Sequence, residues 1–382
     1  MAHFSSTISR IAAEEAYQDK ILPGVSRTFA LTIPQLPAEL RKVVTNAYLL
    51  CRIVDTLEDE PSLSAFQKVT LHERFLSVLR GEEKAQRFAK QVTPLLSEAT
   101  SPNERELMAN TPSIVACTRT LTASQQQVLI KCVRIMCRGM GCYQGRASLE
   151  GLQDLAEVDR YCYHVAGVVG EMLTELFCQH SAEIHEKRPE LLALAPSFGE
   201  GLQLTNILKD LWDDRQHGVC WLPRKEFREF GVELASMAPG RGDQAFTAAL
   251  RYMIGIAHAH LHNAFRYTLM IPSTESGIKR FCLWAIGLAV FTLRRIDARP
   301  TYRSGRQVKV SRRIVKATFV STSLTARHDW MLKLLFTGVT TGLPLRPFPG
   351  PDPELSAWAS ESYIGGDFPT ASGGRLQPKG DQ

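Results

Sequence analysis

Residues 38–60 read AELRKVVTNAYLLCRIVDTLEDE, and this stretch decides the fold class. Over 38–57 its apolar side chains recur every three or four positions, which is the period of an α-helix with one buried face. The same period dominates the rest of the chain, and the alternation typical of strands is nearly absent. We therefore predict an all-α protein, with further helices at 62–80, 84–97, 123–147, 154–179, 188–213, 243–269, 274–296 and 313–338, and with a loop at SPNE (101–104).

The composition indicates one large helical domain. The chain has 382 residues, 44% of them hydrophobic, which is enough for a sizeable core and too apolar for a disordered protein. No shift in composition divides the chain and no solenoid-type repeat is visible, so we assign residues 1–342 to one all-helical domain. Residues 343–382 hold seven prolines and six glycines, a composition that predicts a disordered tail.

The net charge of +6 comes from a single basic strip. Residues 294–316 hold nine Lys or Arg against Asp297, so this strip contributes +8 and the rest of the chain sums to −2. A nucleic-acid partner is not expected, because the slightly acidic remainder would not extend a basic track. The strip itself could be a solvated or membrane-facing surface, or a site for an anionic ligand.

We expect a cytoplasmic protein. The nine cysteines are odd in number and none forms a C-x-x-C pair, which favours reduced thiols over disulfides or zinc. Glu14, Glu15 and Asp19 interrupt the first 20 residues, where a secretory signal would need an apolar run. The longest apolar run, 281–290, is too short to cross a bilayer.

Two acidic clusters carry the strongest chemical signal. Each has carboxylates at positions i, i+3 and i+4 after an apolar run, so on a helix its three carboxylates share one face. Burying several carboxylates is costly unless cations neutralise them, and hard oxygen ligands suit Mg²⁺ bridging to a substrate phosphate. A solvated acidic helix end is the alternative, and the duplicated spacing favours the metal site. The clusters are Asp55, Glu58 and Asp59, and Asp210, Asp213 and Asp214.

Groups suited to anion binding surround these clusters. Arg52 precedes Asp55 by one helical turn, and Gln203 and Asn206 stack on the same side as Asp210. A third segment, 157–170, places Tyr161 and His164 on one helix face, so either could point into a cavity. Its glycines at 167 and 170 cost helix propensity, which indicates that a neighbouring helix or an apolar ligand approaches the backbone closely.

Five motifs, in this order, resemble the squalene and phytoene synthase family over about residues 20–320: GVSRTFALTIPQLP (24–37), DTLEDE (55–60), YCYHVAGVVG (161–170), QLTNILKDLWDD (203–214) and WLP (221–223). The resemblance implies a single-domain isoprenoid-synthase helical bundle with a central apolar cavity. It also implies head-to-head joining of two prenyl diphosphates, with Mg²⁺ and the diphosphates bound at both acidic clusters.

The resemblance implies roles for individual residues. All six carboxylates of the acidic clusters would bind Mg²⁺ and diphosphate, and Asp55, Asp59, Asp210 and Asp214 would act in catalysis together with Tyr161, a proton-transfer or diphosphate-contacting group. The diphosphate contacts would be Ser26, Arg27, Arg52, Gln203 and Asn206. Aromatic positions along the prenyl cavity would be Phe29, Tyr48 and Phe281.

Two features favour the squalene branch of the family, which uses farnesyl diphosphate and reduces its intermediate with NADPH. DTLEDE (55–60) resembles that branch's first motif, and RQVKVSRR (306–313) resembles its basic segment near the nicotinamide cofactor, with Lys309 matching one contact. The alternatives are a phytoene or dehydrosqualene synthase, which lacks the reductive step, and a non-catalytic member with an assembly role. An apolar product would leave into lipid, so the helix around 330–336 either contacts a membrane peripherally or packs on the core.

Three positions depart from the family pattern. Ser311 stands where the basic segment commonly has Arg, so Arg312 would have to substitute for it as a cofactor contact. Lys209 replaces the Arg that usually precedes the second acidic cluster, which keeps the charge but loses bidentate geometry. Val219 stands where the family has an Arg that helps to enclose the diphosphate.

Overall fold

The computed structural model describes residues 2–26, 28–143 and 148–346, and these residues contain helices and no strand. In chain order the helices are α1 (Ala2–Val25), α2 (Phe29–Thr32), α3 (Ala38–Asp59), α4 (Ala65–Arg80), α5 (Ala85–Val92), α6 (Pro102–Ala109), α7 (Thr111–Thr118), α8 (Ala123–Tyr143), α9 (Leu155–Cys162), α10 (Val168–His180), α11 (Ala182–His185), α12 (Arg188–Gln216), α13 (Arg224–Glu229), α14 (Gln244–Met270), α15 (Ser276–Asp297), α16 (Gly305–Val308), α17 (Arg312–Thr325) and α18 (Asp329–Thr340). Short 3₁₀ turns lie at Ile33–Gln35, Thr93–Leu95 and Ser273–Glu275.

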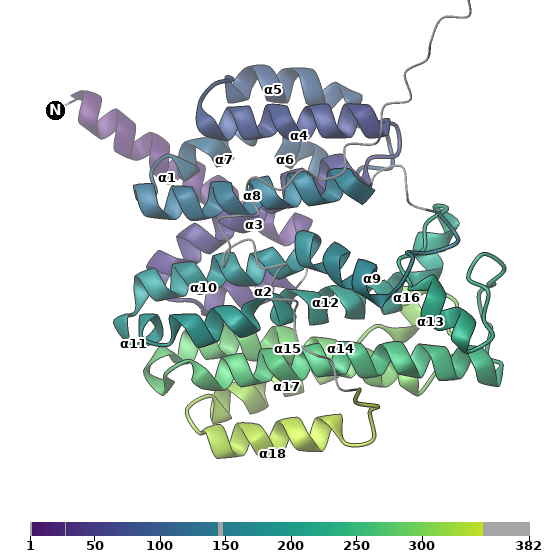
Figure 1. Ribbon diagram of the computed structural model, residues 1–382. Coiled ribbons are helices and arrows are strands. Elements are labelled where there is room, and N and C mark those ends of the chain that lie inside the picture. Colours follow the sequence, from purple (N-terminus) through teal and green to yellow (C-terminus); the bar gives the residue numbers. More distant parts are fainter. Residues whose placement is uncertain (1, 27, 144–147, 347–382) are drawn as a thin grey trace, which may run out of the picture.

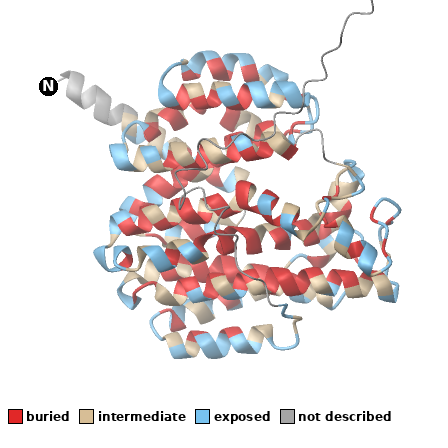
Figure 2. Cartoon of the chain, viewed as in Figure 1, coloured by how far each residue is buried: buried red, intermediate tan, exposed pale blue. Residues whose placement is uncertain are grey.

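The long helices stack in layers around a buried centre. Figure 1 shows α4 and α5 at one end and α18 at the other, with α3, α8, α10, α12, α14 and α15 between them. Helix α12 packs against α10, α14 and α15, and α3 packs against α1 and α8. Figure 2 shows the buried residues concentrated in these central helices, and the buried apolar residues form one continuous core cluster. The helices of the described residues confirm the all-α prediction.

Helix α3 forms as its sequence predicts. The apolar residues expected on its inner face are all buried, namely Leu40, Val43, Val44, Ala47, Leu50, Cys51 and Val54. The helix runs two residues beyond the expected end at 57, and its C-cap residue Glu60 adopts an extended conformation. The first acidic cluster therefore lies in the last turn and a half of a helix whose opposite face is anchored in the core.

Three expectations from the sequence were wrong in detail. The helix expected at 313–338 is two helices, α17 and α18, because the chain turns between Thr325 and Asp329. The helix expected at 154–179 contains a π-helical segment at Tyr163–Gly167, where the extra residue shifts the faces of α9 and α10. The loop expected at 101–104 begins helix α6, since Ser101 and Glu104 form a capping box.

The domain boundary expected at residue 342 falls shortly after the end of α18 at Thr340, and residues 347–382 of the expected tail lie outside the described residues. One described segment, Ser273–Asp297, is long and apolar enough to cross a membrane. It consists of α15 and the turn before it, and 67% of its most apolar window is buried inside the bundle. Packing in the core therefore accounts for its apolar composition.

Candidate active site

A cavity of 820 Å³ opens between the central helices. Its apolar wall comes mainly from α10, α12 and α15, and polar residues from α3 and α12 gather at one part of it. The wall includes many of the polar and aromatic residues predicted from the sequence and two cations of the quoted basic segment: Ser26, Phe29, Tyr48, Arg52, Asp55, Gln203, Asn206, Lys209, Asp210, Asp213, Phe281, Arg306 and Lys309. Packing thus brings together residues that are up to 283 positions apart in the sequence.

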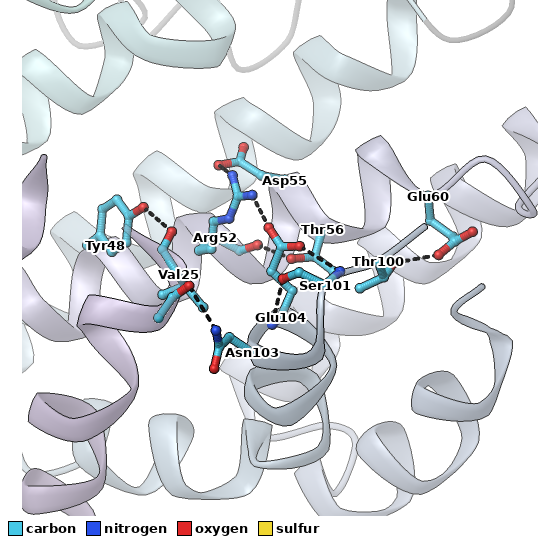
Figure 3. Close-up of polar contacts among 11 residues, drawn as sticks. Val25, Tyr48, Arg52, Asp55, Thr56, Glu60, Thr100, Ser101, Asn103 and Glu104 are labelled. Atoms are coloured by element: carbon cyan, nitrogen blue, oxygen red, sulfur yellow. Dashed lines mark hydrogen bonds and ion pairs between the residues drawn. The ribbon is translucent and has the colours of Figure 1, made fainter. Parts of the chain in front are cut away.

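The first acidic cluster faces this cavity through Asp55. Figure 3 shows Arg52 between the carboxylates of Asp55 and Glu104. The Arg52 Nη1 atom lies 3.7 Å from Asp55 Oδ2, and Nη2 donates to Glu104 Oε1. Loss of hydration raises the pKa of Asp55 to about 7 against the opposing effect of Arg52, and the neighbouring Asp59 and Glu58 raise this pKa further. The positive charge of Arg52 alone therefore does not offset the burial and mutual repulsion of the carboxylates around it.

Glu104 is a site residue that the sequence reasoning missed. It was placed in a loop, whereas its side chain reaches Arg52 and also accepts from the backbone N–H of Ser101, with a donor–acceptor distance of 3.1 Å. Its pKa is lowered, because the hydrogen bond and charge of Arg52 outweigh the effect of burial. The S-x-x-E capping-box pattern at 101–104 was the signal that could have placed it at a helix start beside α3.

Glu60, the last acidic residue of the same motif, has a different environment. Its carboxylate is buried and accepts hydrogen bonds from Ser62 N at 2.9 Å, Ser97 N at 2.8 Å and Thr100 Oγ1 at 2.6 Å. Burial alone would raise its pKa, but these hydrogen bonds lower the pKa to about 2. Glu60 is therefore a charged residue that holds the loop at 97–100 in place, and it does not line the cavity.

The second acidic cluster lies on α12 beside a glycine of α16. Lys209 Nζ is 3.0 Å from Asp210 Oδ2, and Gly305 N donates to Asp213 Oδ2 at 3.0 Å. A Cβ atom at Gly305 would lie only 2.5 Å from Asp210 Oδ1, so a side chain at this position would displace the Asp210 carboxylate. Lys209, which departs from the family Arg, thus contacts the first carboxylate of the cluster directly.

The two clusters act on each other electrostatically. Loss of hydration raises the pKa of Asp214 to about 7, and Asp210 on its own helix and Asp59 from α3 raise this pKa further. Burial raises the pKa of Tyr161 well above its usual range, and the charges of Asp59, Glu58 and Asp214 add to this shift. The charges of both clusters therefore act on Tyr161, although neither it nor Glu58, Asp59 or Asp214 is part of the cavity wall.

Aromatic packing fixes Tyr161 and the apolar wall. The Tyr161 ring stacks on Trp221 of the WLP motif, with ring centroids 4.1 Å apart and planes at 7°. In the cavity, the ring centroid of Phe29 lies 5.0 Å from that of Tyr48 and 6.5 Å from that of Phe281. The three predicted aromatic positions thus form one surface.

The remaining predicted diphosphate contacts lie along the polar part of the cavity wall. Ser26 Oγ accepts from Phe29 N at 3.0 Å and so helps to set the start of α2. Gln203 and Asn206 lie on the cavity-facing side of α12, and Lys209 Nζ donates to Asn206 Oδ1 at 3.1 Å. Arg27, also predicted as a diphosphate contact, lies outside the described residues.

Helix packing explains Gly170, one of the two glycines of the 157–170 segment. A Cβ at Gly170 would lie 2.1 Å from the backbone oxygen of Ala195, so α10 and α12 are in backbone contact there. His164 does not point into the cavity but packs against Gly139 of α8, since a Cβ at Gly139 would lie 2.2 Å from its ring. Of the two candidates on that face, Tyr161 is the one whose pKa the charges of both acidic clusters raise.

The basic strip is divided by the fold. Arg306 of α16 and Lys309 just after it line the cavity, whereas Arg294 donates to the backbone oxygens of Val339 and Thr341 at the end of α18. Arg312, the second predicted cofactor contact, is exposed on the first turn of α17 and is not part of the cavity wall. Only part of the basic strip therefore lies at the cavity, namely Arg306 and Lys309.

Ser311, where the family segment commonly has Arg, has a local structural role. Its side chain accepts from Ile314 N at 3.4 Å and caps α17. A serine favours a helix start here, which explains why α17 begins at Arg312.

A second buried polar cluster, which the sequence reasoning did not identify, lies between α9, α12 and α14. His260 Nδ1 is 3.2 Å from Glu200 Oε2, and His260 Nε2 is 3.8 Å from Asp159 Oδ1. The possible ligand atoms of these residues lie within 4.8 Å of one another, but the two carboxylates face different nitrogens of the imidazole, which a single metal ion would not join. Burial raises the pKa of Glu200 to about 8 and lowers that of His260 to about 4, so at neutral pH Glu200 holds a proton and His260 is uncharged.

The sequence and the fold have counterparts among known proteins. A family model described as squalene/phytoene synthase matches residues 22–313, and the chain belongs to this family. The squalene synthase of Eremothecium gossypii is 28% identical over 279 residues, which cover 72% of this chain and 60% of that protein. The human squalene synthase is 28% identical over 274 residues, with 72% and 61% covered. The chain thus spans about three-fifths of the length of these relatives.

Solved structures share the all-helical fold. TcSQS in complex with the ligand BPH1237 matches with a TM-score of 0.68 at 22% identity, covering 88% of this chain and 94% of that chain. A dehydrosqualene synthase in complex with a ligand matches with a TM-score of 0.51 at 18% identity, covering 86% and 99%. At these identities the likeness establishes the fold.

Proposed function

We propose that this protein joins two farnesyl diphosphates head to head to presqualene diphosphate in a Mg²⁺-dependent reaction, and reduces this intermediate with NADPH to squalene. The observation that carries the proposal is the pairing of an apolar 820 Å³ cavity with two acidic clusters that act on each other electrostatically. A farnesyl diphosphate would match both parts of this site. Its apolar hydrocarbon chain suits the cavity, and its highly charged diphosphate suits cations held at the acidic clusters.

The carboxylates fit a hard cation. The six donors of the two clusters are all oxygen ligands, and the raised pKa values of Asp55 and Asp214 show that their negative charge is incompletely neutralised. In this proposal Mg²⁺ is held by Asp55, Glu58, Asp59, Asp210, Asp213 and Asp214. When bound, Mg²⁺ would neutralise charge on the departing diphosphate and so favour ionisation to an allylic cation.

The other residues orient and protect the substrate. Ser26, Arg27, Arg52, Gln203 and Asn206 hold the diphosphates. The pKa of Tyr161 is raised well above its usual range, so its hydroxyl keeps its proton and can donate a hydrogen bond to a diphosphate oxygen. The rings of Phe29, Tyr48 and Phe281 exclude water and offer π faces to a carbocation, an interaction of about 2 kcal/mol where water is absent.

We assign the nicotinamide cofactor to the cavity wall at α16. Arg306 and Lys309 offer two cations there, which suits the phosphates of NADPH, and the bound cofactor would supply the hydride. Replacing Lys309 with Ala should raise KM for NADPH about tenfold and leave presqualene diphosphate formation unchanged, whereas Arg312→Ala should change KM by less than Lys309→Ala does. Equal effects of the two changes on KM would contradict this assignment.

Product analysis tests the reaction itself. The protein is incubated with farnesyl diphosphate and Mg²⁺, with and without NADPH, and products are identified by mass spectrometry. We expect presqualene diphosphate without NADPH and squalene with it. Formation of dehydrosqualene regardless of NADPH would place the protein in the non-reductive branch, and formation of phytoene from longer prenyl diphosphates would assign a different chain length.

A non-catalytic assembly role is tested at the carboxylates. Asp59→Asn and Asp213→Asn each remove one charge with little change in volume. If neither substitution lowers turnover, the acidic clusters do not bind the catalytic metal and the proposed function is wrong.

A further inference from the structure

Helices α17 and α18 carry an unusual concentration of exposed apolar side chains. In the described part of the chain, eleven large hydrophobic residues are exposed, and five of them fall on these two consecutive helices. The five, which we call the outer apolar face, are between 37 and 74% exposed: Val320 and Leu324 on α17, and Trp330, Leu334 and Leu335 on α18.

The opposite faces of both helices are firmly packed. Phe319 of α17 stacks on Trp284 of α15, with centroids 3.8 Å apart and planes at 11°. Phe336 of α18 stacks on Phe265 of α14, with centroids 4.1 Å apart and planes at 4°. The sequence had left open whether the 330–336 helix packs on the core or contacts a membrane. The structure separates the two, because Leu332 and Phe336 are buried whereas Trp330, Leu334 and Leu335 are exposed.

Positive charge accompanies the outer apolar face. The two helices and the turn between them carry five exposed cations, Arg312, Arg313, Lys316, Arg327 and Lys333. Their one carboxylate, Asp329, already accepts a hydrogen bond from the buried Lys279 Nζ at 2.6 Å. Along α17 the residues Arg313, Val320 and Leu324 follow a helical period and share one stripe, and Arg327 lies in the turn just after this helix.

We propose that the outer apolar face of α17 and α18 docks on an anionic lipid bilayer. Apolar side chains interleaved with Lys and Arg on a helix surface suit the boundary between acyl chains and phosphates, where the apolar groups leave water and the cations meet headgroups. This docking goes beyond the proposed function, because it requires neither substrate nor catalysis. A lipid surface fits better than a protein partner of mixed charge. The exposed charges beside the outer apolar face are all positive, so they complement a surface that is uniformly negative.

The docking surface lies next to the cavity. Val315, on the inner side of α17, lines the cavity together with Leu288 and Ala289 of α15. Docking would therefore place one wall of the cavity against the bilayer. If the proposed function holds, an apolar product would have a short path into lipid there, and this consequence alone rests on the proposed function.

Vesicle co-sedimentation of the full chain tests the proposal without substrate. Vesicles of phosphatidylcholine alone are compared with vesicles containing about one third phosphatidylserine. We expect binding to the anionic vesicles that weakens as salt is added. The triple variant Leu324→Ser, Trp330→Ser, Leu334→Ser should bind more than tenfold more weakly, and Lys316→Glu with Lys333→Glu should lose at least about tenfold on anionic vesicles.

Matched controls separate docking from folding and from other surfaces. Phe66, on α4 at the far end of the molecule from α18, is 80% exposed, so Phe66→Ser removes an equally accessible aromatic group and should leave binding unchanged (Figure 1). Far-UV circular dichroism and condensing activity with dispersed farnesyl diphosphate should stay the same in the triple variant. If the wild-type protein itself has no condensing activity, the proposed function is wrong, but the vesicle-binding test of the outer apolar face is unaffected.

Three results would overturn the proposal. The first is equal vesicle binding by the wild-type protein and the triple variant. The second is loss of binding on removal of residues 347–382 with the outer apolar face intact, which would assign the contact to that segment. The third is a wild-type dimer in solution that the triple variant converts to a monomer, which would show that a second copy covers this face.

Discussion

Asp55 and Glu60 belong to one acidic motif, yet their environments are opposite. At Asp55, loss of hydration and neighbouring carboxylates raise the pKa to about 7, with Arg52 as the opposing cation. At Glu60, three hydrogen bonds outweigh burial and lower the pKa to about 2. The comparison teaches that a carboxylate whose charge is already satisfied is structural, whereas a crowded carboxylate at a cavity is suited to receive a cation.

The largest effect is expected from the crowded carboxylates. Asp55→Asn or Asp214→Asn should lower the kcat/KM for condensation of farnesyl diphosphate by at least about 100-fold, because each removes a proposed metal ligand. The free energy of unfolding should stay the same or rise slightly, since a repelling charge disappears. Steady-state kinetics and thermal unfolding measure the two quantities. A kcat/KM within threefold of wild type would show that Asp55 and Asp214 are not ligands.

Metal binding should stabilise the protein through the same residues. Added to protein first treated with EDTA, Mg²⁺ at about 100 times its Kd should raise the free energy of unfolding by about 2.7 kcal/mol, visible as a higher Tm. The increase should be smaller in Asp55→Asn and Asp214→Asn and unchanged in Glu60→Gln, relative to wild type. An equal Mg²⁺ response in all four proteins would place the metal elsewhere.

Glu60 should show the reverse pattern. Glu60→Gln weakens hydrogen bonds to a charged acceptor and leaves donors of the 97–100 loop poorly matched, so we expect about 2 kcal/mol less stability. Condensing activity per folded molecule should remain near wild type, because hydrogen bonds from Ser62, Ser97 and Thr100 already satisfy the Glu60 carboxylate and leave it no need of a cation. Denaturant unfolding gives the stability. A stable variant with low activity would mean that Glu60 belongs with Asp55 after all.

Glu200 adds a third environment, in which a proton neutralises the carboxylate. Its pKa is raised by burial to about 8 in the folded protein, so above its unfolded pKa the unfolded chain holds fewer protons and stability falls as pH rises. His260, with its pKa lowered to about 4, acts in the opposite sense below its ordinary value of 6.5. The net decline should therefore appear between about pH 6.5 and 8 and amount to about 1 kcal/mol.

Glu200→Gln tests this account directly. Glutamine has no proton to lose, so the variant should lack the decline in stability over that pH interval, as measured by denaturant unfolding at several pH values. His217→Gln, at an exposed position, serves as a control substitution that should keep the decline. A variant with the wild-type pH dependence would assign the titration to another group.

Local spacing predicted much of the fold and of the site. The period of the apolar residues placed α3, α12 and α14, because one helix buries one face whatever covers it. The i, i+3, i+4 spacing likewise placed each acidic cluster on a single helix face. Spacing failed at α17 and α18, where two short helices continue one apolar period across a turn, and at Glu104, whose capping-box pattern is brief.

The sequence by itself determined the helical class, the two acidic clusters and the motifs shared with the squalene/phytoene synthase family. Only the tertiary structure decided that Asp55 faces the cavity while Glu60 holds a loop, and that the basic strip is shared between the cavity and the surface of α17. The physical reason is that spacing fixes which side chains share a face of one helix. The partners, hydration and charges that a side chain then meets come from residues remote in the sequence, and these set its pKa and its role.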